Sequence, residues 1–228
     1  MTDDRRDHAS SAGHPWHLII WALAGASFLI AVDIWTTGFG PGLVRETGGI
    51  EIASALLYAY AAIAWLWTRP GENWKTSWQV PAIMLLMMGR EFDLDKKLTS
   101  IGVLRSDLYL TDMAPVLDRI LGLIALAFVA TVAIRLVKMG AKEFVAGLRM
   151  RTLWAWSIVG ALAFAILSKA VDGIGRKLAP FGITLESGTS LQMVILEELL
   201  ELGIPLMLLV AVISSTTRVT RSSRTSFR

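Results

Sequence analysis

The stretch LQMVILEELLELGIPLMLLVAVI (Leu191–Ile213) contains the two features that decide the fold of this chain. It is long enough to cross a bilayer as a helix, because about 20 apolar residues span the hydrocarbon core. It also carries Glu197, Glu198 and Glu201, and an intramembrane charge costs about 2.5–3.5 kcal/mol. The stretch therefore predicts a membrane helix that turns one polar face toward the protein interior.

Similar apolar runs recur along the 228 residues, 54% of which are hydrophobic and 18% charged. We expect an all-α polytopic membrane bundle of six transmembrane helices. The third is short or broken, because the uncharged stretch 79–89 is followed at once by Arg90 and Glu91; we expect its helix to begin near Ser77. The expected spans are residues 16–35, 50–67, about 77–91, 114–137, 152–171 and 191–213.

Three regions are expected along the chain. Residues 1–15 form a disordered or interfacial tail, residues 16–213 the six-helix transmembrane domain, and residues 214–228 a basic tail rich in Ser and Thr. Six spans put both termini on one side, and the basic residues of 136–151 and of the C-terminal tail favour the cytoplasm. The lipid bilayer then accounts for the net charge of +3, and nucleic-acid binding is not expected.

Most charged residues within or beside the spans fall on one side of the membrane if the spans alternate in direction. Glu197 and Glu201 are four residues apart and Glu198 and Glu201 three, so the three acids share a stripe about one turn tall. A cation, a basic partner or a proton is needed to relieve such crowding. We expect a ligand- or cation-binding pocket in the outer leaflet, formed by Glu51, Arg90, Glu91, Arg119, Lys169, Glu197, Glu198 and Glu201. Ser54 and Tyr58 share a helix face with Glu51.

The chain has no cysteine, and its histidines, His8, His14 and His17, all lie near the N-terminus. A metal in the pocket would therefore need oxygen ligands, which suit Mg²⁺, Ca²⁺ or Mn²⁺. Glu197, Glu198 and Glu201 are the candidate metal ligands. No Ser-His or Cys-His nucleophile can form at this depth, and the sequence identifies no catalytic residue.

The segment REFDLDKKLTSIGVLRSDLYL (Arg90–Leu110), together with the later EELLE, resembles a group of uncharacterised small bacterial inner-membrane proteins. The resemblance implies a bacterial inner-membrane location and implies no activity.

Three functions remain open. The pocket could bind a cation, a lipid headgroup or another small polar ligand and could be catalytic, with Arg90 or Arg119 stabilising a phosphate. The chain could instead be a proton- or cation-coupled transporter or channel, although the inner halves of the helices carry no charge. A third alternative is an accessory or scaffold subunit in which the acids only hold helices together.

Overall fold

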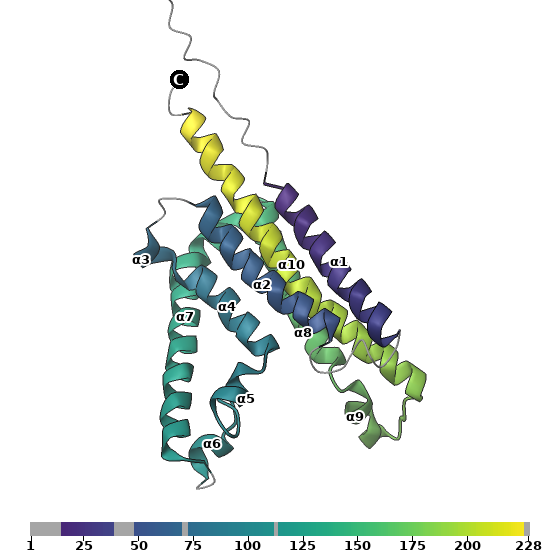
Figure 1. Ribbon diagram of the computed structural model, residues 1–228. Helices are drawn as coiled ribbons and strands as arrows, with labels where there is room; N and C mark the ends of the chain where they lie inside the picture. The colour runs from purple at the N-terminus through teal and green to yellow at the C-terminus, as the bar shows by residue number, and fades with distance from the viewer. Residues whose placement is uncertain (1–14, 39–47, 70–72, 112–113, 226–228) are drawn as a thin grey trace, which may run out of the picture.

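The computed structural model describes residues 15–38, 48–69, 73–111 and 114–225, with side chains through residue 216. Within these ranges the regular elements are all helical. Figure 1 shows long helices packed side by side, with α10 running through the middle of the bundle. The elements are α1 (His17–Thr37), α2 (Gly49–Thr68), α3 (Trp74–Ser77), α4 (Gln79–Glu91), α5 (Leu94–Leu98), α6 (Asp107–Leu110), α7 (Val116–Arg149), α8 (Leu153–Val171), α9 (Ile174–Leu178), the single-turn η1 (Ala179–Phe181) and α10 (Ser187–Thr225).

Five helices of the described ranges, α1, α2, α7, α8 and α10, are long and apolar enough to cross a membrane. The fold is therefore all-helical and compatible with a membrane protein. The expected count of six spans is not confirmed, because the third expected span, at α4, is not among these five helices. α4 has only 13 residues, which corresponds to a rise of about 20 Å against a hydrocarbon core of about 30 Å. It begins at Gln79, close to the expected start, and Pro81 lies in its first turn, where a missing N–H leaves no bond unmade.

Two helices continue further than hydropathy alone predicts. α7 runs unbroken to Arg149, so most of the loop expected at 136–151 is helical. α10 runs to Thr225, so the basic segment expected as a separate tail is mostly a continuation of the last helix. In α7 the extension contains Lys and Ala, which are good helix formers, so that helix need not end where its apolar run ends.

The ends of several helices are tied together at one end of the bundle. The backbone N–H of Gly49 at the start of α2 donates to Asp33 Oδ2 near the end of α1 at 2.9 Å. Below α4, the chain folds back through α5 and α6 against α7, and the N–H of Ser100 donates to Asp118 Oδ2 at 2.9 Å. These contacts join the end of α1 to the start of α2, and the segment before α6 to the start of α7.

The opposite half of the bundle is filled by apolar side chains. α2 packs against α1, α4 and α10, and in this half it does so through a row of small residues that includes Ala61, Ala62 and Ala64, each nearly inaccessible. Small residues let helix backbones approach closely. Leu209 and Ile213 of α10 are fully buried in the same cluster. The acidic residues described next therefore occupy one end of the bundle, away from this apolar cluster.

Candidate functional site

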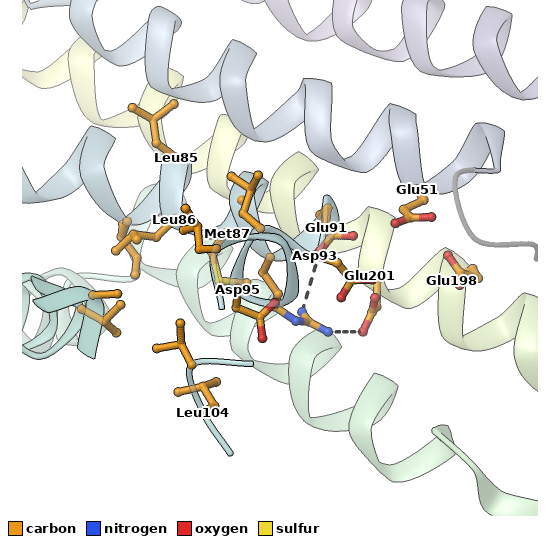
Figure 2. Close-up of a pocket in the computed structure, with 18 residues that line it drawn as sticks. Glu51, Leu85, Leu86, Met87, Glu91, Asp93, Asp95, Leu104, Glu198 and Glu201 are labelled. Carbon is orange, nitrogen blue, oxygen red and sulfur yellow. Dashed lines mark hydrogen bonds and ion pairs between the residues drawn. The ribbon is translucent and has the colours of Figure 1, made fainter. Parts of the chain in front are cut away.

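A pocket of about 690 Å³ lies beside α4, between the acidic residues of α2 and α10 and the apolar faces of α5 and α7. Its volume is within the range of small-molecule sites. Figure 2 shows Glu51, Glu198 and Glu201 on one side of this space and Leu85 and Leu86 on the other. The lining residues are Glu51, Ile83, Leu85, Leu86, Met87, Gly89, Arg90, Glu91, Asp93, Leu94, Asp95, Leu98, Val103, Leu104, Ala125, Val129, Glu198 and Glu201.

Glu201 is the junction of the pocket. Its Oε1 accepts a hydrogen bond from Arg90 Nη2 at 2.9 Å and another from Ser168 Oγ at 2.9 Å. Ser168 is buried and belongs to α8, so one carboxylate oxygen joins α4, α8 and α10. Hydrogen bonds to a charged group are the stronger kind, and this junction positions Arg90 at the rim of the pocket.

Two other glutamates of the pocket lack such partners. The side chain of Glu91 is only 6% exposed, yet its one contact with a basic group is Arg90 Nη1 at 3.7 Å, which is too long for a hydrogen bond. Glu198 makes no hydrogen bond or ion pair with any described residue. Glu51 lies in the first turn of α2, where the helix dipole favours a negative charge. Glu91 and Glu198 are therefore carboxylates for which the described part of the chain supplies no hydrogen-bond donor.

The acids extend from α4 into α5. Asp93, in a left-handed conformation with φ of 49°, turns the chain out of α4, and its carboxylate pairs with Lys96 at 2.7 Å. Asp95 lines the pocket one turn into the same segment. Neither residue was predicted to belong to the site. The sequence after Glu91 has the mixed charge of a loop, and such loops normally lie at the solvated surface.

Two buried hydroxyls lie on α2 behind the acids. Tyr58 and Ser54 are almost completely inaccessible, and neither hydroxyl has a hydrogen-bond partner among the described residues. The Tyr58 phenol lies close enough to Arg90, Glu91 and Glu201 for electrostatic interaction with all three. A buried hydroxyl without a partner is destabilising by about 1–3 kcal/mol. The shared face of Glu51, Ser54 and Tyr58 expected from the sequence thus turns toward the polar end of the bundle.

Three residues of the predicted site do not line this pocket. Arg119 Nη2 donates to the carbonyl oxygen of Thr111 at 2.7 Å. Lys169 is largely exposed, and its ammonium donates to Asp172 Oδ2 at 3.0 Å, which holds the pKa of that carboxyl below its usual value. Glu197 lines a separate cavity of about 50 Å³ beside the end of α8. Neighbouring residues of a helix point about 100° apart, so Glu197 and Glu198 face different partners.

The candidate metal ligands Glu197, Glu198 and Glu201 do not lie together as one group of ligands in the structure. In the part of the chain that the structure describes, no three His, Asp or Glu side chains are arranged to hold a metal ion. The rotation that separates Glu197 from Glu198 is the physical reason, since a divalent ion needs its oxygen ligands within about 2.0–2.6 Å.

The sequence also missed the apolar half of the pocket and Ser168. For the apolar half, Leu94 and Leu98 gave a signal, because they are four residues apart on either side of three charged residues and so share one face of a helix. Comparison of the chain with protein-family models, with curated proteins and with solved structures finds no match. Function is therefore inferred from the pocket and its charges.

Proposed function

We propose that this chain is a multi-pass protein of a bacterial inner membrane that binds an organic cation of the ammonium type in the pocket beside α4. The proposed orientation has both termini in the cytoplasm, and the pocket opens in the outer leaflet. The distribution of basic residues and the resemblance of Arg90–Leu110 to bacterial inner-membrane proteins support this location.

The observation that carries the proposal is the excess of acidic side chains in the pocket. Arg90 is the one basic residue among the described residues that line it, and Glu201 already accepts from its guanidinium. Carboxylates crowded in a medium of low dielectric constant are stabilised when a cation sits among them. The acidic lining residues are Glu51, Glu91, Asp93, Asp95, Glu198 and Glu201.

An ammonium group suits this arrangement better than a bare divalent ion or an anion. A divalent ion demands several oxygens at short, fixed distances, whereas an ammonium donates hydrogen bonds to carboxylates over a wider range of geometries. An anionic headgroup would have to compete with Glu201 for Arg90 and would face the remaining acids. The cation is therefore favoured over the anionic, lipid-like ligand that the sequence left equally open.

Binding of butylammonium to the full chain in lipid nanodiscs tests this proposal, with butyrate as the anion of similar size. We expect butylammonium to bind more tightly than butyrate. Glu198→Gln should weaken it about tenfold or more, because a hydrogen bond to a charged group contributes about 1.5–3 kcal/mol. Glu143→Gln is the matched control, since Glu143 is exposed on the far part of α7. Equal binding of butyrate, or equal effects of the two substitutions, would sink the proposal.

A further inference from the structure

The pocket beside α4 has two chemically different ends. In Figure 2 Glu51, Glu198 and Glu201 gather on one side, which we name the acidic end. Leu85 and Leu86 lie on the other side, which we name the apolar end, where α7 also contributes its lining residues. A ligand that is only a small cation would fill the acidic end and leave the apolar end empty.

A buried carboxylate without a donor lines the pocket beside the acidic end. Glu91 lines the pocket between the two ends, and more than nine-tenths of its side chain is buried. No donor among the described residues reaches it within hydrogen-bond distance, since Arg90 Nη1 is 3.7 Å away. A buried carboxylate without a donor is costly unless a proton or a ligand supplies one.

The apolar end is lined by side chains that the protein only partly covers. Leu85 of α4 is 48% exposed and Val129 of α7 is 37% exposed, although both line the cavity. Ala125, one turn before Val129, is a small residue at the same wall. Since α4 is shorter than a full span and α7 is a full membrane helix, these side chains border the hydrocarbon of the bilayer.

We propose that the ligand is a single-chain cationic amphiphile, an amine-bearing lipid or long-chain amine, whose head pairs with the acidic end while its tail lies along the apolar end between α4 and α7. This inference rests on the proposed function and names its ligand class. The tail reaches the site from the bilayer, where such molecules are already concentrated. Each methylene that leaves water at the apolar end tightens binding by about threefold to fourfold at most.

The test compares butylammonium with decylammonium on the full chain in nanodiscs, by equilibrium dialysis, with empty nanodiscs correcting for uptake by lipid. We expect decylammonium to bind at least tenfold more tightly than butylammonium. Val129→Phe, which fills the apolar end, should weaken decylammonium about tenfold and change butylammonium less than twofold. Ala125→Phe is a second filling variant in case Val129→Phe does not fold. Ile124→Phe is the control on the exposed face of α7.

The outcomes separate the two proposals. If both amines bind equally, or if the filling variants behave like Ile124→Phe, the amphiphile is refuted while binding of an organic cation stands. If neither amine binds, the proposed function fails and the inference fails with it. If decanol binds as tightly as decylammonium, the head contributes nothing and the cation site is refuted. Loss of both amines in Glu198→Gln, with loss of decylammonium alone in Val129→Phe, would support both.

Discussion

The ion pair between Arg90 and Glu201 should contribute measurably to the stability of the bundle. The two residues are 111 positions apart, and their contact at 2.9 Å ties α4 to α10. A hydrogen bond with a charged group contributes about 1.5–3 kcal/mol. The side chain of Arg90 is 45% exposed and that of Glu201 15%, so solvent screening lowers the expected value. We expect a coupling energy of about 1–2 kcal/mol.

A double-mutant cycle measures this coupling directly. The four chains are the natural protein, Arg90→Gln, Glu201→Gln and the double variant, each unfolded by a denaturing detergent in mixed micelles. The nine tryptophans of the chain provide a fluorescence signal for unfolding. The non-additive part of the four free energies of unfolding is the pair's coupling energy.

The pair Asp93–Lys96 is the matched control. It is as short, at 2.7 Å, but its side chains are more exposed, and an exposed pair three residues apart contributes about 0–0.5 kcal/mol. A coupling for Arg90–Glu201 below about 0.5 kcal/mol, or equal to that of the control pair, would refute the view that Glu201 is the junction of the pocket.

Three further predictions follow from particular contacts. Ser168→Ala should lower the free energy of unfolding by about 1–2 kcal/mol, because it removes a hydrogen-bond donor to Glu201. Tyr58→Phe should instead raise the free energy of unfolding by about 1–3 kcal/mol, because it removes a buried hydroxyl that has no partner among the described residues. Chemical denaturation measures both values, and a loss of stability in Tyr58→Phe would contradict the description of that hydroxyl. Gly203→Ala should be at least about 1 kcal/mol less stable than Gly25→Ala. An added Cβ at Gly203 would lie 2.7 Å from Phe164 Cδ2 at the α8–α10 contact, whereas a Cβ at Gly25 would meet no atom within 4 Å. Equal stabilities of the two variants would show that Phe164 moves aside freely. The chain has no cysteine, so a single introduced cysteine can be labelled selectively. Ser100→Cys should react with a membrane-impermeant maleimide in intact cells, and Lys142→Cys should react only after permeabilisation. The reverse result refutes the proposed orientation, and labelling of both cysteines from one side refutes a membrane crossing by α7.

The all-helical fold and the positions of the five long apolar helices could be predicted from the sequence, because apolar runs of about 20 residues are typical of helices that cross a bilayer. The number of spans could not be predicted at α4, because its 13 residues are too few for a full crossing. The full lengths of α7 and α10 were also missed, since hydropathy reports where a chain meets lipid and not where its backbone hydrogen bonds end.

The sequence by itself determined that acidic residues from several helices gather at one end of the bundle, because antiparallel helices bring those ends together. It could not determine which acids share a pocket. That choice depends on helix rotation, which turns Glu198 toward Glu51 and Glu197 toward the end of α8. It also depends on contacts between residues far apart in the chain, such as Ser168 with Glu201, and on the gap between a short α4 and a long α7. Rotation, distant contacts and helix spacing are properties of packing, so only the tertiary structure decided them.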